Sequence, residues 1–245
     1  EIATTLNRCA AELSADRNTG VAIYNLLGII CNYFQADRSY IFDIDYTILI
    51  PDWSKEDDYF KLYIPLEEQE RFFKCKQDIL NKYERDFPKY NTKTLSDYFG
   101  KYGFTVTEDV INGWMLYNGE TIVDEVVDGT LALFEYLKEN DKEIVILTNW
   151  FSGTQIPRLK RAGLLQYIDK IVAGENAMKP GLKSFELAIG ETEKEDCIMI
   201  GDSIRSDKAG ADNVGIDCYI VDKNHTIQDL YEVIRSNENE VKKQL

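Results

Sequence analysis

The feature that most constrains the fold of this chain is a regular alternation of short apolar segments and helical segments in its second half. Apolar runs typical of strands lie at residues 143–147, 170–172, 197–200 and 217–221. Segments with a helical spacing of apolar residues lie at 130–138, 156–162, 184–189, 207–212 and 227–234. Strands and helices that alternate at this length form a parallel sheet with helices on both faces. The sequence therefore predicts an α/β fold.

One more strand-like run lies well before this pattern, and a long helical segment separates the two. Tyr40–Ile44 is short and apolar, and polar residues follow it at once. From residue 52 to residue 125 a helical spacing of apolar residues dominates, and Pro88 should end one of these helices. We therefore expect a helical insert between the first strand and the rest of the sheet.

The insert is rich in aromatic residues. It holds 15 of the 29 aromatic residues of the chain, which favours a small helical core filled with rings over a dedicated aromatic binding site. We expect Thr92 or Thr94 to cap one of its helices, and Thr107 to cap another. The rings that we consider as candidates for facing a ligand are Trp53, Tyr59, Trp114 and Tyr117.

The first 38 residues stand apart from both patterns. Apolar residues recur there at helical spacing in two stretches, with a break between residues 16 and 20, which predicts a helical hairpin. We expect this hairpin to pack its apolar faces on the rest of the molecule. The predicted organisation is an N-terminal helical extension at 1–38, an α/β core formed by 39–51 and 126–245, and a helical insert at 52–125.

The net charge limits which partners the chain can bind, and the cysteine content indicates the cellular compartment. The chain has 28 basic and 43 acidic residues, and its net charge of −15 disfavours binding to nucleic acid or to an anionic membrane. The five cysteines are odd in number, are widely spaced and form no CxxC pair, which predicts reduced thiols in a cytoplasmic protein. The apolar run at residues 21–31 is too short to span a bilayer.

The residues that directly follow the strands are the ones that carry chemistry. In an open parallel sheet, ligands bind beyond the carboxyl ends of the strands, so side chains at these positions converge. They are Asp43, Asp45 and Thr47 after the first strand, Thr148 and Asn149 after the second, Lys179 after the third, and Gly201, Asp202 and Asp207 after the fourth. Several carboxylates that converge on one lysine need a counter-ion, and their hard oxygen ligands favour magnesium.

Four short motifs at these positions resemble the signature motifs of the haloacid dehalogenase-like superfamily. They are DIDYT at 43–47, ILTN at 146–149, KP at 179–180 and GDSIRSD at 201–207. Each motif alone is as typical of a turn or a helix start, but the four in this order and spacing favour a catalytic site. The resemblance implies a Rossmann-like core, and the helical insert resembles the type-1 cap of that superfamily.

The resemblance also implies a role for each motif residue. Asp43 would be the nucleophile that forms an aspartyl-phosphate, and Asp45 the general acid and base. Dehalogenases of the superfamily lack this second aspartate, so Asp45 favours phosphoryl transfer over cleavage of a carbon–halogen bond. Thr148 and the backbone amide of Asn149 would hold the phosphoryl oxygens, and Thr47 would support the loop.

The remaining motif residues would neutralise negative charge or bind the metal ion. Lys179 would neutralise the nucleophile and the phosphate. Mg²⁺ would be bound by the side chains of Asp43 and Asp202 and by the backbone carbonyl of Asp45, and Asp207 would orient this set.

Three positions fall outside this pattern. Tyr46 stands where the superfamily usually has glycine, so its side chain is expected to shape the pocket or to restrict the segment that follows. The stretch at residues 33–42 resembles the start of a GAF sensor domain. His225 is the only histidine and lies outside the motifs, and we expect it on the surface rather than as a general base.

The sequence as a whole predicts a magnesium-dependent phosphatase, a phosphoric monoester hydrolase, for a small phosphorylated metabolite. Nucleotides and sugar phosphates are the candidate classes of substrate. A phosphomutase with the same nucleophile is an alternative, and so is a non-enzymatic sensor or binding module. The expected partner is a small molecule, with no nucleic acid and no membrane, and the sequence predicts no oligomeric state.

Overall fold

In the computed structural model of the chain, the residues that are described are 39–242, with side chains up to residue 236. The predicted helical extension at 1–38 lies outside the described residues, and so does most of the stretch that resembles a GAF domain. Within the described residues, no helix is long and apolar enough to cross a membrane.

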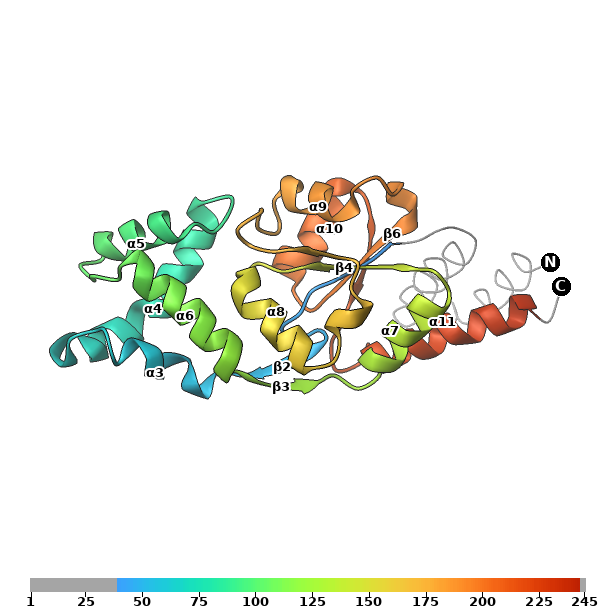
Figure 1. Cartoon of the computed structure of the whole chain (residues 1–245). Coiled ribbons are helices and arrows are strands. Elements are labelled where there is room, and N and C mark those ends of the chain that lie inside the picture. The colour runs from blue at the N-terminus through green and yellow to red at the C-terminus, as the bar shows by residue number, and fades with distance from the viewer. Residues whose placement is uncertain (1–38, 243–245) are drawn as a thin grey trace.

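The centre of the molecule is a parallel sheet (Figure 1). Within the described residues it has five strands in the order β5-β4-β1-β6-β7, and every neighbouring pair is parallel. The strands are β1 (Ser39–Phe42), β4 (Glu143–Leu147), β5 (Lys170–Val172), β6 (Cys197–Gly201) and β7 (Asp217–Ile220). This arrangement confirms the predicted α/β fold. The first strand of the chain takes the central place, where Phe42 pairs with Ile146 on one side and with Ile200 on the other.

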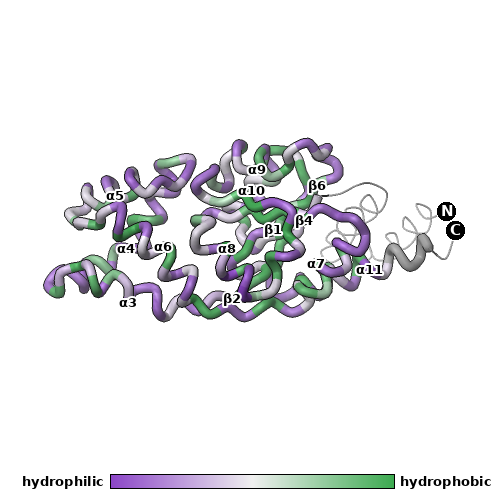
Figure 2. Tube along the Cα trace, viewed as in Figure 1, coloured by the Kyte–Doolittle hydropathy of each residue, from purple (hydrophilic) through white to green (hydrophobic). Residues whose placement is uncertain are grey.

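Helices cover both faces of the sheet because successive side chains of a strand point to opposite faces. Tyr40 and Phe42 of β1 pack in one buried cluster, together with α7 (Thr130–Glu139), α8 (Ser152–Arg161) and α11 (Ile227–Lys242). Ile41 packs in a second cluster with α9 (Leu182–Ile189) and α10 (Ala209–Val214). In Figure 2 the strands at the centre of the parallel sheet are mostly green, which marks hydrophobic residues, and the segments around them are more hydrophilic.

The helices at residues 53–121 form a separate body beside the sheet, which we call the cap (Figure 1). It consists of η1 (Trp53–Lys55), α3 (Glu56–Phe60), α4 (Leu66–Asp86), α5 (Thr92–Lys101) and α6 (Glu108–Thr121). The cap has its own buried cluster, which confirms the predicted core of rings. At its centre the ring of Phe60 lies 4.9 Å from that of Phe72 and 4.7 Å from that of Trp114.

The N-cap residues of two helices test the sequence analysis directly. Thr107 caps α6 as predicted, because its side chain accepts a hydrogen bond from the amide of Val110. The prediction that Thr92 or Thr94 caps α5 was wrong. Asn91 takes that position, and its side-chain oxygen accepts from the amide of Thr94 at 3.0 Å. Asn91 has the extended backbone of an N-cap, whereas Thr92 already lies inside the helix.

The two connections between cap and core run side by side as a small antiparallel pair. β2 (Leu49–Asp52) enters the cap and β3 (Val123–Val126) leaves it, with Leu49 opposite Val126 and Asp52 opposite Val123. The sequence analysis placed no strands here. We propose 52–125 as the cap insert, 39–51 with 126–245 as the core, and this ribbon as the joint between them.

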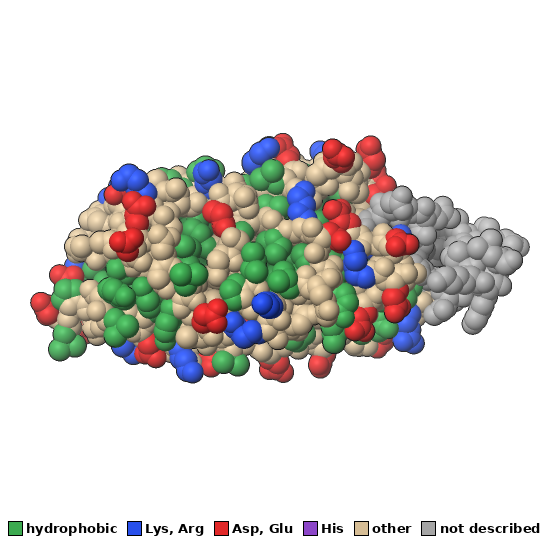
Figure 3. Space-filling view, viewed as in Figure 1, with side chains coloured by type: hydrophobic (Ala, Val, Ile, Leu, Met, Phe, Trp, Pro, Cys, Tyr) green, Lys and Arg blue, Asp and Glu red, His purple; other side chains and the backbone are tan. Residues whose placement is uncertain are grey.

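The remaining segments are short. η2 (Leu165–Tyr167) and η3 (Lys194–Asp196) are single turns before strands, and η4 (Ile204–Lys208) is a π-helical turn that leads into α10. Where the sequence predicted a helix at 207–212, the structure has this turn from Ile204 and then α10, which ends at Val214. On the face drawn in Figure 3, acidic and basic side chains are interspersed.

Candidate active site

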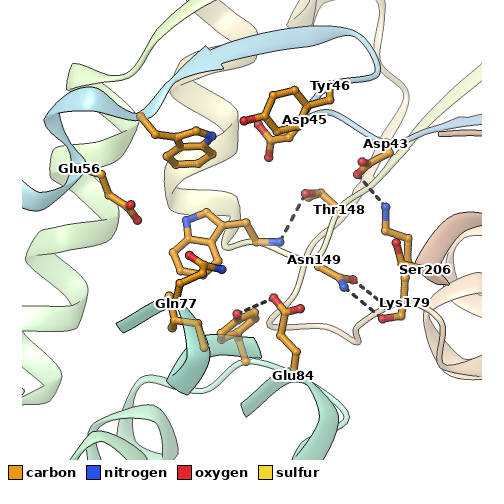
Figure 4. A pocket seen from close by; sticks show the side chains of 14 residues that line it. Asp43, Asp45, Tyr46, Glu56, Gln77, Glu84, Thr148, Asn149, Lys179 and Ser206 are labelled. Atoms are coloured by element: carbon orange, nitrogen blue, oxygen red, sulfur yellow. Dashed lines mark hydrogen bonds and ion pairs between the residues drawn. The ribbon is translucent and has the colours of Figure 1, made fainter. Parts of the chain in front are cut away.

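The residues that follow the central strands meet at one edge of the sheet and open into a cavity of about 500 Å³ (Figure 4). Asp43 directly follows β1, and its amide donates to the carbonyl of Ile200 in β6 at 2.9 Å. Thr148 directly follows β4, and its amide donates to Val172 of β5 at 3.0 Å. The lining residues are Asp43, Asp45, Tyr46, Trp53, Glu56, Gln77, Leu80, Glu84, Tyr90, Thr148, Asn149, Trp150, Lys179 and Ser206.

Lys179 links two buried carboxylates at the floor of this cavity. Its Nζ lies 2.7 Å from Oδ1 of Asp43 and 2.6 Å from Oδ1 of Asp207. Burial alone would lower the pKa of the Lys179 ammonium, but the charges of Asp43 and Asp207 raise it above its usual value. Lys179 is therefore a permanent positive charge next to Asp43.

The surroundings of Asp43 disfavour its charged form. Burial, which Lys179 opposes and the charges of Asp207 and Asp45 reinforce, raises the pKa of Asp43 to about 7. Burial, followed by the charge of Asp207, also raises the pKa of Asp202. The lysine alone does not offset the negative charge gathered here.

A divalent cation fits this excess of charge. Carboxylate oxygens of Asp43, Asp202 and Asp207 all lie within 4.8 Å of one another. Three hard oxygen ligands at this spacing suit Mg²⁺, and the raised pKa values show carboxylates that a cation would return to their charged form. The sequence analysis chose the side chains of Asp43 and Asp202 and the backbone carbonyl of Asp45 as ligands. Both of these side chains belong to the group, which also contains Asp207.

Asp207 is held in place by the backbone of its own motif. Its Oδ2 accepts from the amide of Ser203 at 3.0 Å. A side chain at Gly201 would collide with the Asp207 carboxylate, so glycine is required at the end of β6 for this close approach.

Asn149 supports Lys179 through its side chain. Its Oδ1 accepts from the amide of Lys179 at 2.6 Å, and its Nδ2 donates to the carbonyl of Lys179 at 3.1 Å. Sequence reasoning considered only the backbone amide of Asn149, as a partner of the phosphoryl group. The side chain adds a second role, which is to fix the loop that presents the lysine.

The two threonines differ in their surroundings. Thr148 lines the cavity, and its Oγ1 accepts from Nε2 of Gln155 at 3.0 Å. Thr47 is buried, and its hydroxyl makes no hydrogen bond to the described part of the chain. Its amide donates to the carbonyl of Ile44 at 3.3 Å within the turn that carries Asp45.

Asp45 is fixed by two residues of α8 that sequence reasoning missed. Nη2 of Arg158 lies 2.7 Å from Oδ1 of Asp45, and Nε2 of Gln155 lies 3.2 Å from Oδ2. The Arg158 side chain is fully buried and also binds Asp124 of β3, with Nε 3.0 Å from Oδ2. Burial lowers the pKa of Arg158, but Asp124 and Asp45 outweigh this effect and raise it. The proposed acid and base is thus joined to the ribbon between cap and core.

Tyr46 has a backbone conformation that is unusual for a residue other than glycine, and its side chain is exposed. Its φ of 61° lies in the left-handed region that favours glycine, at a cost of about 1–2 kcal/mol for other residues. Its side chain is 51% exposed and lines the cavity beside Asp45. The expected influence on the pocket therefore has a structural basis, because the ring occupies space at the mouth.

The cap closes the other side of the cavity. Of the four rings considered from sequence, Trp53 lines it, whereas Trp114 is fully buried in the cap core, and Tyr59 and Tyr117 pack against each other at 5.3 Å. Gln77, Glu84 and Tyr90 line it without having been foreseen. His225 is exposed, as predicted, and does not line the cavity; it pairs with Asp222.

Comparisons with known proteins agree with this geometry. The family model of haloacid dehalogenase-like hydrolases matches residues 57–221. Pyrimidine 5'-nucleotidase YjjG of Escherichia coli is 37% identical over 93 residues, which are 36% of this chain and 41% of that protein. Ribulose-1,5-bisphosphate 5-phosphatase of Halopiger xanaduensis is 32% identical over 113 residues, which are 44% of this chain and 46% of that protein. The chain spans about half the length of the curated relatives it matches.

A solved structure shares the fold. The magnesium-bound HAD-hydrolase YfnB of Bacillus subtilis has a TM-score of 0.58 at 21% identity, and the match covers 82% of this chain and all of that one. At this identity the similarity supports the fold.

Proposed function

The chain belongs to the haloacid dehalogenase-like hydrolases, and from this premise we propose that it is a magnesium-dependent phosphatase that acts on a small phosphorylated metabolite. The observation that carries the proposal is the pairing of Lys179 with both Asp43 and Asp207, beside Asp202 and two residues from Asp45. This set contains a nucleophile, a cation to neutralise it, a group of metal ligands and a second carboxylate for proton transfer.

The chemistry follows from the positions of Asp43 and Asp45. A carboxylate oxygen of Asp43 forms a bond to phosphorus while the bond from phosphorus to the leaving oxygen breaks, and Asp45 gives its proton to that oxygen. Asp45 then takes a proton from water, whose oxygen bonds to phosphorus and releases Asp43. Lys179 holds Asp43 in place during both steps. Thr148 and the amide of Asn149 would bind the phosphoryl oxygens.

Asp43, Asp202 and the backbone carbonyl of Asp45 would hold Mg²⁺, and Asp207 would orient them. When bound, the ion offsets the negative charge of the phosphoryl group. The names of the curated relatives, which act on pyrimidine nucleotides and ribulose bisphosphate, support nucleotides and sugar phosphates as substrate classes. A cytoplasmic location is supported by free thiols at Cys75, Cys197 and Cys218.

The test is phosphate release from an aryl phosphate by the wild type and by Asp43→Asn, with Mg²⁺ and with a chelator. We expect release by the wild type with Mg²⁺, none above background by Asp43→Asn, and loss of activity on chelation that added Mg²⁺ restores. Asp58→Asn, a change at an exposed carboxylate of the cap, is the matched control. Equal rates for the wild type and Asp43→Asn would refute the nucleophile.

A further inference from the structure

The cap wall of the cavity has a chemical character of its own. α4 places Gln77, Leu80 and Glu84 on one face, because residues three and four apart lie above one another on a helix. Figure 4 shows Gln77 and Glu84 across the cavity from Asp43 and Asp45. Since the phosphoryl group would lie next to Asp43, the leaving group would lie against this wall.

The wall is acidic. Among the described residues that line the cavity, Lys179 is the only basic one, and both of its ion pairs are with carboxylates of the floor. Glu56 of the wall is matched by Lys76, whose Nζ lies 2.7 Å from its Oε2. Glu84 has no ion pair within residues 39–236.

Glu84 is built as a hydrogen-bond acceptor. It is half-buried, and Oε1 accepts from the hydroxyl of Tyr90 at 2.8 Å. Burial raises the pKa of Glu84, while the Tyr90 hydrogen bond and the charges of Lys179 and Arg205 lower it. A donor from a ligand stabilises the charged form of such a carboxylate.

The rings beside Glu84 are rigid. The indole of Trp150 meets the ring of Tyr90 at 5.1 Å and 77°, and that of Trp114 at 5.0 Å and 79°. Its Nε1 donates to Oγ1 of Thr154 at 3.2 Å. Trp53, Tyr90 and Trp150 line the cavity and give it apolar, planar surfaces that suit a flat ligand, whereas Trp114 is buried and only supports Trp150.

Resting on the phosphatase activity proposed above, we propose that this wall selects a leaving group that combines a planar ring with an amino group, and that it rejects one with a second anionic group. The amino group donates to Glu84, and the ring packs on the aromatic side chains. A second phosphate or a carboxylate would instead face Glu84 and Glu56. A site built around a half-buried acceptor discriminates against ligands that leave it unpaired.

Three matched substrates test this selection: 4-(aminomethyl)benzyl, 4-methylbenzyl and 4-carboxybenzyl phosphate. They share the ring and the reacting oxygen, and differ only in the substituent at the far end, which is cationic, neutral or anionic. For the wild type with Mg²⁺ we expect kcat/KM to fall in that order, with about ten-fold or more between the first and the second, as for a hydrogen bond to a charged group.

Glu84→Gln isolates the carboxylate. The amide can still accept from Tyr90 but has lost the charge, so the preference for the aminomethyl over the methyl substrate should fall about ten-fold. Glu70→Gln, a change at an exposed position of the same helix, should leave all ratios unchanged. If Glu84 only positions Tyr90, all three substrates change alike and their ratios persist, which overturns the proposal.

Other results separate the selection from the activity. The wild type could release phosphate from 4-methylbenzyl phosphate and yet prefer the carboxybenzyl compound. That result would overturn the proposed selection and leave the phosphatase activity standing. It would also indicate exposed Arg205 as the partner of the anion. If the wild type hydrolyses neither these three compounds nor the aryl phosphate, the proposed activity fails. The selection is then judged by calorimetric binding of the three compounds to Asp43→Asn, and tighter binding of the carboxybenzyl compound contradicts it.

Discussion

Lys179 shows how strongly single residues are coupled at the centre of this site. Its ammonium is buried between Asp43 and Asp207, and neither carboxylate has an equivalent partner elsewhere among the described residues. Two buried carboxylates and one buried ammonium are costly to desolvate, so each relies on the others. Burial is the main reason that the pKa of Asp43 rises to about 7, and the charges of Asp207 and Asp45 add to it.

Removing this ammonium should be costly at neutral pH. In Lys179→Met the two carboxylates lose their counter-charge, and we expect the free energy of unfolding in a chelator to fall by about 3–5 kcal/mol at pH 7.5. The loss should be smaller at pH 5, where Asp43 is protonated. Urea denaturation at both pH values measures this difference, with Lys208→Met at a partly exposed ion pair as control. Equal losses at both pH values would contradict the charge argument.

The raised pKa of Asp43 also predicts how stability depends on pH. The pKa in the folded state, about 7, lies above the ordinary value of 3.8, so the folded state binds the proton more tightly. The resulting stability is fully present below about pH 4 and is lost as the pH rises towards 7. Melting temperatures of the chelated protein between pH 4 and pH 7 should therefore fall more steeply for the wild type than for Asp43→Asn. Parallel curves would show that Asp43 does not titrate in this range.

At the scale of elements, α8 connects the loop after β1 to the β2–β3 ribbon. Arg158 joins Asp45, which follows β1, to Asp124 of β3, and Gln155 one turn earlier contacts both Asp45 and Thr148. A guanidinium can bind two carboxylates at once because its donors have a fixed planar geometry. Arg158 therefore acts as a positioning residue for the proposed acid and base.

Lysine should not replace Arg158. In Arg158→Lys the charge remains but the forked contact to Asp45 and Asp124 is lost, so we expect kcat on an aryl phosphate to fall about 10–100-fold with little change in KM. Lys160→Arg, at an exposed site of the same helix, is the control. Full activity of Arg158→Lys would show that charge alone suffices.

The contact between cap and core depends on glycine. α6 approaches α8 closely at Gly119, where a Cβ would lie 2.9 Å from the carbonyl oxygen of Gly153 and 3.3 Å from Cγ of Pro157. Gly119→Ala should lower the free energy of unfolding by about 1–3 kcal/mol. Gly153→Ala, also in a helix, meets no described atom within 4 Å and should be neutral or stabilising by up to about 1 kcal/mol. Denaturant titration of both variants measures the difference, and equal stabilities would contradict the predicted clash.

At the scale of the whole molecule, the site forms where two bodies meet. The core supplies the carboxylates and Lys179, and the cap supplies the opposite wall. Beyond the β2–β3 ribbon, the bodies touch through backbone hydrogen bonds from Tyr90 to Gly174 at 2.8 Å and from Met178 to Pro88 at 2.9 Å. The loop that carries Lys179 therefore lies against the cap.

Bound Mg²⁺ should stabilise the molecule because the folded state gathers carboxylates that are dispersed in the unfolded chain. We expect the melting temperature to rise with Mg²⁺ concentration, as for any ligand that binds only the folded state. Asp202→Asn should reduce this rise, whereas Asp212→Asn at an exposed ion pair should keep it. Calorimetry of both variants gives a readout that does not depend on activity, and an unchanged rise in Asp202→Asn would remove Asp202 from the metal site.

The sequence by itself determined the order of strands and helices in the α/β core and the motif residues at the strand ends. The strands at 143–147 and 170–172 were predicted with the bounds observed. The first is clear in sequence because a strand buried on both faces is a nearly continuous apolar run, and residues 144–147 are all buried. The position of Asp43, Thr148 and Asp202 after such runs follows from the same pattern.

Only the tertiary structure decided which distant residues meet. The β2–β3 ribbon pairs segments more than 70 residues apart, and its two strands, with the sequences LIPD and VDEV, are not continuous apolar runs. Arg158 could have been a surface arginine of an amphipathic helix, and Glu84 one acid among the many of the cap. Sequence periodicity shows which face of a helix is apolar, whereas the partner of a polar side chain depends on how separate elements pack.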